Sequence, residues 1–268
     1  MSKSVIRELT VLRTQHITPH MKRITLGGDD LSSFPRDHET AYVKLMFPRP
    51  AASKLSFNPM TMLRKTSKPW VRTYTVRRFD PDTLELDIDF VIHGDDGPAS
   101  KWAMNASPGA QITLTGPGAR KLVDLEADWF FLVGDMTALP ALAINLESLP
   151  RNAKGYFVVE IMEEADAQEL KTPQDVEVHW VIAPHPGQEN TCLVDTVKAL
   201  PFLEGRPSIW AACEFASMRA LRQYFRHEKQ VDRSDSYISS YWKKGLSEEQ
   251  HKVAKRRDSG GAMANAQA

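Results

Sequence analysis

The hydrophobic pattern changes near residue 125, and this change constrains the fold more than any other feature of the chain. Before it, short segments with β-branched residues are separated by Gly, Pro and Asp, as in antiparallel barrels or sandwiches. After it, residues 129–133 form a continuous apolar run, which is typical of a buried parallel strand. Apolar residues then recur at helical spacing over 139–149. The sequence therefore predicts a β domain followed by an α/β domain.

The individual elements follow from the same patterns. In 84–93, alternate apolar residues form one face and Glu85, Asp87 and Asp89 form the other, which predicts a strand. Thr137 can cap the helix that follows the apolar run, and Pro140 is tolerated in its first turn. The expected strands are 5–16, 21–26, 41–47, 71–78, 84–93, 111–114, 129–133, 156–161, 178–182 and 209–213, and the expected helices are 139–149 and 216–228.

These elements suggest three regions along the chain. We expect a β domain at 1–124, an α/β domain with a parallel sheet at 125–245, and a C-terminal region at 246–268. The polar stretch 246–258 predicts an exposed helix. Residues 259–268 have no apolar periodicity, so a flexible tail is expected there.

Charge and cysteine content exclude several classes of protein. The chain has 34 Lys and Arg against 34 Asp and Glu, so no global field attracts nucleic acid or an anionic membrane. Its two cysteines are too few for an iron–sulfur cluster and favour a reduced, cytoplasmic location. No apolar run approaches the roughly 20 residues that span a bilayer. Nothing in the sequence requires more than a monomer.

The first segment with possible chemistry is 72–77 (RTYTVR). A strand here places Arg72, Tyr74 and Val76 on one face and the neighbouring Thr73, Thr75 and Arg77 on the other. An aromatic ring, a hydroxyl and guanidinium groups suit a flat ring system that carries a diphosphate. An amphipathic strand with solvated arginines has the same pattern, so spacing alone leaves both interpretations open.

Two further segments could bind a nucleotide. In 93–102 (HGDDGPASKW), glycines allow close backbone approach, and Pro98 can open a helix whose free amides would meet an anion. Residues 134–140 (GDMTALP) lie where a buried strand leads into a helix, a usual nucleotide position in open α/β sheets. Each segment could equally be an ordinary loop. No glycine-rich dinucleotide fingerprint or Walker A motif is present.

Taken together and in this order, the segments resemble the siderophore-interacting proteins, flavoproteins of the ferredoxin reductase-like superfamily. The resemblance covers roughly 5–245. It is carried by 72–77 (RTYTVR), 89–94 (DFVIHG), 97–102 (GPASKW), 134–140 (GDMTALP), 210–214 (WAACE) and 240–245 (SYWKKG). It implies an N-terminal antiparallel FAD-binding β-barrel followed by an α/β domain of the nicotinamide-binding type, acting as a ferric-siderophore reductase with NAD(P)H or reduced ferredoxin as the donor.

The resemblance also assigns residues by motif position. FAD would be held by Arg72, Tyr74, Thr75, Val76, Asp89, Phe90, Val91, His93, Gly97, Pro98, Ala99, Ser100, Trp102, Thr137, Ala138 and Trp242. The electron donor would meet Gly134, Asp135, Thr137 and Glu214, and an anionic ferric siderophore would meet Lys44, Arg120 and Lys243. Met136 stands where the family often has Glu, and Cys213 replaces the usual Gly, so the chain departs from the family in the donor half.

Other functions fit parts of the sequence. No hydrolytic triad or convincing metal-ligand cluster is evident, and no side chain is assigned a catalytic role, because the hard chemistry belongs to the cofactor. A flavin reductase or ferredoxin–NADP reductase-like enzyme with another acceptor would need the same flavin strand. A carrier that binds siderophores without reducing them would not need that strand.

Overall fold

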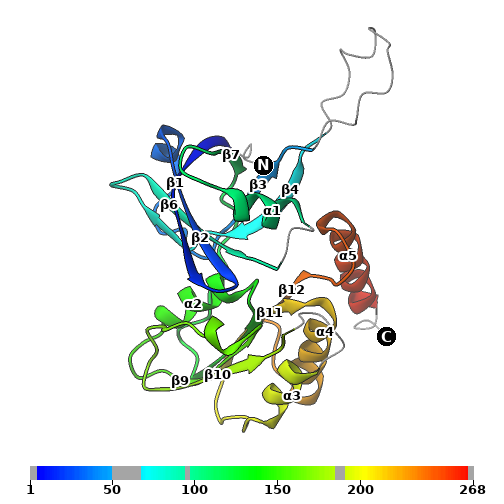
Figure 1. Ribbon diagram of the computed structural model, residues 1–268. Helices are drawn as coiled ribbons and strands as arrows, with labels where there is room; N and C mark the ends of the chain where they lie inside the picture. Colours follow the sequence, from blue (N-terminus) through cyan, green and yellow to red (C-terminus); the bar gives the residue numbers. More distant parts are fainter. Residues whose placement is uncertain (1–4, 50–67, 94–96, 185–190, 265–268) are drawn as a thin grey trace.

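The structure is a computed structural model that describes residues 5–49, 68–93, 97–184 and 191–264, with side chains described up to residue 259 (Figure 1). Its first half is a seven-stranded antiparallel sheet in the order β4-β3-β7-β1-β2-β6-β5. The strands are β1 (Ile6–Thr18), β2 (Met21–Gly27), β3 (Tyr42–Phe47), β4 (Trp70–Thr75), β5 (Arg78–Asp80), β6 (Glu85–Val91) and β7 (Gln111–Thr115). The antiparallel fold predicted for this half is confirmed, although the sheet is barrel-like and does not close between β4 and β5.

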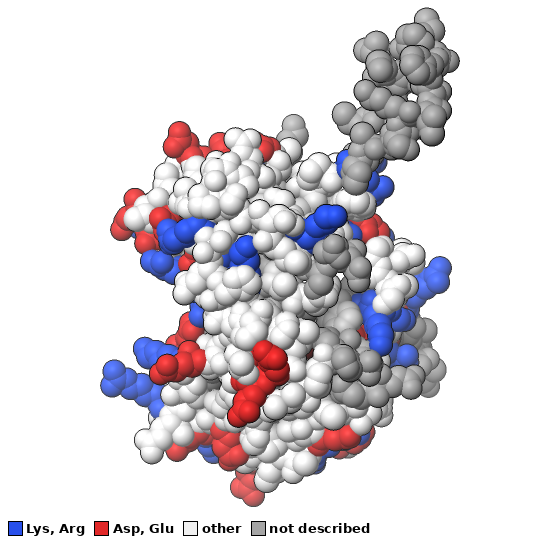
Figure 2. Space-filling model, viewed as in Figure 1, with Lys and Arg blue, Asp and Glu red and all other residues white. Residues whose placement is uncertain are grey.

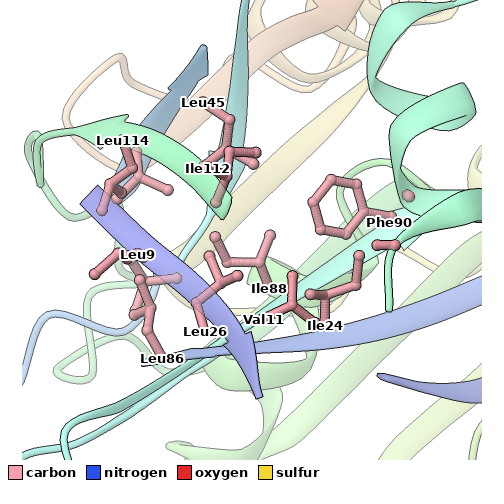
Figure 3. Packing of buried hydrophobic residues seen from close by; sticks show 14 of the residues in the cluster. Leu9, Val11, Ile24, Leu26, Leu45, Leu86, Ile88, Phe90, Ile112 and Leu114 are labelled. Atoms are coloured by element: carbon pink, nitrogen blue, oxygen red, sulfur yellow. The ribbon is translucent and has the colours of Figure 1, made fainter. Parts of the chain in front are cut away.

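The interior of this sheet contains the apolar residues that alternate along its strands, as Figure 3 shows for Leu9, Ile24 and Ile88. The acidic face of β6 is largely buried, because Asp87 and Asp89 are both only 5% exposed. Thr25 donates a hydrogen bond to Asp87 at 2.6 Å. Both carboxylates are buried because neighbouring β2 supplies donors to them. The predicted strand 71–78 is also divided, since β4 ends at Thr75 and β5 begins at Arg78.

The second half is a five-stranded parallel sheet in the order β10-β9-β8-β11-β12. Its strands are β8 (Trp129–Asp135), β9 (Lys154–Ile161), β10 (Asp175–Ile182), β11 (Pro207–Glu214) and β12 (Ser236–Trp242), and its helices are α2 (Leu139–Glu147), α3 (Cys192–Ala199) and α4 (Phe215–Gln223). The parallel sheet is confirmed. Every residue of β8 is buried, because α2 packs on one face of the sheet while α3 and α4 pack on the other.

Several local expectations in this half need correction. Ala138, not Thr137, is the N-cap of α2, because the Thr137 hydroxyl bonds to Asp135 instead. The helix expected at 216–228 is α4 followed by a short π-helical turn at Tyr224–Glu228. Strand β12 and helix α3 were not expected from the sequence.

The C-terminal region is a packed helix, α5 (Glu248–Ala264), so the tail expected from residue 259 is wrong as far as residue 264. The predicted exposure of this helix is also wrong in part. His251 is only 5% exposed and bonds to Ser240, and Asp258 forms a two-point ion pair with Arg222 of α4. These anchors explain how a polar sequence without a strong apolar face forms a stable helix. In the described chain no helix is both long and apolar enough to cross a membrane.

The two halves meet at a buried carboxylate. Asp166, in the 3-10 turn Glu164–Asp166 after β9, is fully buried and lies beside the turn between β1 and β2. Its oxygens accept hydrogen bonds from the Thr18 hydroxyl at 2.8 Å, the His20 backbone amide at 2.9 Å and His20 Nδ1 at 2.8 Å. Because these donors belong to the first sheet and Asp166 to the second half, this cluster helps to fix the two halves relative to each other.

Replacing Asp166 with Asn should lower the free energy of unfolding by about 2 kcal/mol at neutral pH, because an amide leaves a buried donor without its acceptor. Burial raises the pKa of Asp166, but the hydrogen bonds from Thr18 and His20 outweigh burial and hold the pKa below its ordinary value. A lowered carboxyl pKa stabilises the fold above the ordinary value of about 3.9, and this contribution is lost as the pH falls through the folded-state pKa.

The measurement is denaturant unfolding of the parent and of Asp166→Asn between about pH 7 and pH 3, the range that spans the ordinary carboxyl pKa. The difference between the two proteins should shrink toward the acidic end. Asp175→Asn, at an exposed position of β10, is the matched control and should change little at any pH. A difference for Asp166→Asn that stays constant throughout would show that ionisation of this carboxyl does not contribute.

Candidate functional site

A cavity of about 1290 Å³ lies between the two sheets. One wall comes from β4, β6 and the start of α1 (Pro98–Asn105), and the other comes from the carboxyl ends of the parallel strands and from α5. This volume exceeds that of a typical drug-sized pocket, so a dinucleotide and a second ligand can share it. Of the site residues predicted from the sequence, those in its lining are Arg72, Tyr74, Thr75, Asp89, Val91, His93, Gly97, Pro98, Ala99, Ser100, Asp135, Thr137, Trp242 and Lys243.

Eight predicted site residues lie outside this lining: Lys44, Val76, Phe90, Trp102, Arg120, Gly134, Ala138 and Glu214. Val76 and Phe90 are fully buried in the core of the first sheet, and the Trp102 ring packs 5.7 Å from Phe90. At Gly134 a Cβ would lie 2.5 Å from the Ala212 carbonyl oxygen, so close strand packing already requires glycine there. For Val76, Phe90, Trp102 and Gly134 the structure shows a packing role, and for all eight residues contact with a ligand stays a prediction.

The edge strand β4 presents Arg72, which the sequence assigned to a phosphate. In the structure its Nη1 donates to Glu249 of α5 at 3.1 Å and to the Val71 carbonyl at 2.9 Å. The next residue, Thr73, donates through its amide and hydroxyl to Glu248 at 3.0 and 2.7 Å. Acidic groups at the start of α5 therefore contact the Arg72 strand along the cavity wall. An anionic ligand that uses Arg72 must compete with Glu249 for it.

Tyr74 follows on the same strand and forms an aromatic part of the wall. Its ring lies 4.3 Å from Phe90, and burial raises the pKa of its hydroxyl, so the hydroxyl is neutral at physiological pH. A neutral phenol beside a guanidinium offers stacking and hydrogen bonding without adding charge.

The start of α1 faces the same cavity. Gly97 is the extended N-cap and Pro98 the first helical residue, and no acidic side chain lies in the first turn. A Cβ at Gly97 would meet nothing within 4 Å, so the space beside this backbone is open. No described side chain caps the helix start. The positive end of the helix is therefore directed at a space that an anion can enter. Residues 94–96 of the predicted loop lie outside the described ranges.

Asp89 lies in the lining, but its carboxylate is already paired. Arg23 donates to both oxygens, at 2.7 and 2.8 Å, and Arg77 Nε lies 3.9 Å from one of them. This pairing gives the buried carboxylate a structural role. Any contact between Asp89 and a bound ribose has to form in addition to it.

At the carboxyl end of the parallel sheet, Asp135 is 6% exposed and accepts hydrogen bonds from Thr137 and Trp242. Burial raises its pKa, and the bonds from these donors only partly offset that effect. Glu214 has both oxygens occupied, since it caps α4 through the Ala216 amide and accepts from the Lys244 amide. The position where the sequence places the donor therefore combines a buried carboxyl with an indole and a hydroxyl.

Each of the three predicted substrate cations has a different described neighbour. Lys44 is exposed on β3 and pairs in register with Thr73. Arg120 donates to the Glu39 carbonyl at 3.2 Å, and the Lys243 ammonium lies 4.4 Å from the centre of the Phe215 ring. On the face that Figure 2 presents, basic side chains lie in several separate groups.

The sequence did not indicate the contribution of α5 to the lining. Glu248, His251, Lys252 and Lys255 all line the cavity, and their spacing places them on one face of the helix. Burial lowers the pKa of His251, which bonds to the Ser240 hydroxyl at 2.8 Å. The i, i+3, i+4, i+7 spacing was visible in the sequence, but a polar stripe alone predicts a solvated face.

One group of possible metal ligands occurs among the described residues, namely His20, Glu163 and Asp166. Both Asp166 oxygens already accept hydrogen bonds, from Thr18, from His20 and from the Glu163 amide. The group is therefore explained as the contact between the two halves.

Comparison with known proteins agrees with this geometry. Residues 10–121 match the siderophore-interacting FAD-binding domain, and residues 127–245 match the siderophore-interacting protein domain. The ferric vibriobactin reductase ViuB of Vibrio cholerae is 34% identical over 249 residues, which cover 91% of each chain. The NADPH-dependent ferric-chelate reductase of Escherichia coli is 39% identical over 153 residues, covering 55% of this chain and 58% of that protein.

Solved structures extend the comparison. The siderophore-interacting protein SipS from Aeromonas hydrophila superposes with a TM-score of 0.81 at 33% identity, covering 96% of this chain and 99% of that chain. Ferredoxin–NADP⁺ reductase from Plasmodium falciparum gives a TM-score of 0.61 at 11% identity, covering 87% of this chain and 95% of that chain, which shows a shared fold.

Arg72→Ala should weaken FAD binding, because it removes a charge-assisted contact worth on the order of 1.5–3 kcal/mol, or roughly ten- to hundredfold in affinity. The measurement is fluorescence titration of FAD into flavin-free protein. Glu249→Gln is the matched control: it removes the competing carboxylate, so FAD should bind at least as tightly as in the parent. If Arg72→Ala binds FAD as well as the parent, β4 does not hold the phosphates.

Proposed function

This chain belongs to the siderophore-interacting protein family, and from that premise we propose that it reduces ferric siderophores with bound FAD, taking electrons from NAD(P)H or reduced ferredoxin. The observation that carries the proposal is the cavity between the two sheets. It brings Arg72, the open start of α1 and the carboxyl end of the parallel sheet into a single space. A pyridine or flavin nucleotide needs cations or helix amides for its phosphates and flat walls for its rings, and these walls supply both.

The residues present fit FAD. The space beside Gly97 at the start of α1 is open and without an acidic neighbour in the first helical turn, which suits a diphosphate. Arg72 can add a bidentate contact once it leaves Glu249. Tyr74 and Thr75 line the wall next to it and suit a flat ring. FAD, when bound, supplies acceptance of a two-electron hydride and release of single electrons.

Release of the iron depends on the chemistry of iron itself, and the separation of donor and chelate depends on the protein. Siderophores hold iron through hard oxygen ligands, and Fe(II) is softer than Fe(III), so reduction weakens the complex. The protein has to admit a donor at one side of the cavity and a bulky chelate at the other, and to keep them apart. The carboxyl end of the parallel sheet, at Asp135 and Thr137, is the donor side we propose. The side near Lys44 and β3 is the chelate side we propose.

Two other functions are distinguished by one experiment. The purified protein should be yellow, bleach anaerobically with NADPH or reduced ferredoxin, and regain its colour when a ferric catecholate or hydroxamate is added. Recolouring by another acceptor but not by the ferric chelates would favour a flavin reductase or ferredoxin–NADP reductase-like enzyme. A colourless protein that still binds the chelate would favour a carrier. The cytoplasmic location, the monomeric state and a ferredoxin partner stay predictions.

Lys44→Ala should raise the apparent KM for an anionic ferric catecholate by a few-fold at low salt, as expected for a partly exposed ion contact. The effect should fade as the screening length falls to about 8 Å at physiological ionic strength. A neutral ferric hydroxamate should be less affected, and flavin reduction by the donor should be unchanged. The measurement is steady-state reduction of both chelates at several salt concentrations.

Lys154→Ala is the matched control, because Lys154 is exposed at the amino end of β9, opposite the end where the cavity lies. It should leave both chelates unaffected. If Lys44→Ala affects both chelates equally at every salt concentration, Lys44 is structural, and the contact for the chelate has to be sought at Arg120 and Lys243.

A further inference from the structure

The indole of Trp242 is held from across the parallel sheet. Trp242 is the last residue of β12, and its Nε1 donates to Asp135 Oδ2 at 2.8 Å. Asp135 ends β8, and β11 lies between these two strands. The β11–β12 register also shifts here, so that Glu214 is paired with Trp242 directly after the Cys213–Ser240 pair. An irregularity of this kind redirects a side chain, and here it coincides with the bond that fixes the indole.

In every described hydrogen bond of the Asp135 side chain, a carboxylate oxygen is the acceptor. Oδ1 accepts from the Thr137 amide at 2.9 Å and from the Thr137 hydroxyl at 2.5 Å, and Oδ2 accepts from Trp242. An Asn side chain would direct N–H groups at one of these donors whichever way it was turned. The arrangement therefore requires a carboxylate rather than any polar residue of this size.

Among the described residues, no Lys, Arg or His side chain forms an ion pair with Asp135 that would hold it more firmly. The titratable groups around it are Glu160 on β9, Cys213 and Glu214 on β11, and Tyr241 on β12. These groups are acidic or neutral, and no described salt bridge includes Asp135. The carboxylate thus depends on its neutral donors, Thr137 and Trp242, which both line the cavity, and Trp242 is the aromatic one of the two.

We propose that Asp135 is a positioning residue that holds Trp242 as the aromatic wall for the planar nicotinamide ring of a pyridine-nucleotide donor. The inference rests on the proposed function and adds the donor class and the residues that receive its ring. Trp242 belongs to the carboxyl end of the parallel sheet, where nucleotides bind in open α/β sheets, whereas the flavin strand β4 belongs to the other sheet. A fixed indole presents a flat apolar face at low entropic cost.

The test is a double-mutant cycle with NADP⁺, which binds without reducing the flavin. Trp242→Phe keeps a ring but removes the N–H donor, and Asp135→Asn keeps the size but removes an acceptor. Each should weaken NADP⁺ binding roughly three- to tenfold, the loss expected for one hydrogen bond. The double variant should be no weaker than either single variant, since both changes break the same bond. Binding is followed by the flavin absorbance change and, in flavin-free protein, by calorimetry.

Trp180→Phe is the matched control, because Trp180, on β10, packs against Phe157 of β9 and lies outside the cavity lining. It should leave NADP⁺ binding unchanged. Additive losses in the double variant would show that Asp135 does not act through Trp242. Weaker FAD retention with unchanged NADP⁺ binding would assign Trp242 to the flavin instead. If Asp135→Asn fails to fold, Trp242→Phe alone still decides whether the N–H contributes to donor binding.

One outcome separates this inference from the proposed function. If the parent protein fails to bind NADP⁺ but is bleached by reduced ferredoxin and recoloured by a ferric chelate, the nicotinamide wall is wrong and the reductase stands. If no donor bleaches the flavin, or no ferric chelate recolours it, the proposed function fails, whatever the cycle shows.

Discussion

The site depends on the contact that holds the two sheets at a fixed separation, because each sheet supplies only one of its walls. Three different kinds of interaction contribute to this contact. Met21, at the start of β2, is fully buried among the apolar residues of the second half. Asp166 accepts hydrogen bonds from the β1–β2 turn, and Arg77 pairs with Glu147 of α2 at 2.7 Å. Apolar burial supplies most of the stabilisation, while the buried carboxylate fixes the geometry more sharply than apolar contacts do.

Hydrophobic periodicity was sufficient for much of the fold. The continuous run in β8 predicted a strand buried on both faces, and the alternation in β6 identified its inner face, including Leu86 and Ile88. Periodicity did not determine the environment of the acidic face of β6. Whether an Asp on that face is solvated or buried depends on the residues of β2, which pairs with β6. The two strands are far apart in the sequence, so a local hydrophobic pattern does not predict their pairing.

In the candidate site, too, locally determined features could be predicted from the sequence and tertiary contacts could not. Segments that form a turn or a helix start, such as Gly97 with Pro98, could be located from the sequence, because local backbone chemistry determines them. The partners of Arg72 and Asp135 could not. Glu249 and Trp242 lie more than a hundred residues further along the chain, and only tertiary packing brings them close. The resemblance to a family named a minority of the lining residues and gave no account of α5, whose sequence reads as a solvated helix.

Helix α5 also contacts an edge strand of each sheet. Glu248 accepts from the amide of Thr73 on β4, and Lys255 donates to the carbonyl of Ser240 on β12. Both strands end their sheets, and an uncovered edge presents unpaired amides and carbonyls to other chains. A single polar helix therefore blocks strand addition at two separate places. Its charged side chains suit this task. Those that face the strands form hydrogen bonds with backbone groups at the sheet edges, and those on the outer side of the helix are solvated. The C-terminal region thus covers one edge of each sheet, independently of any ligand in the cavity.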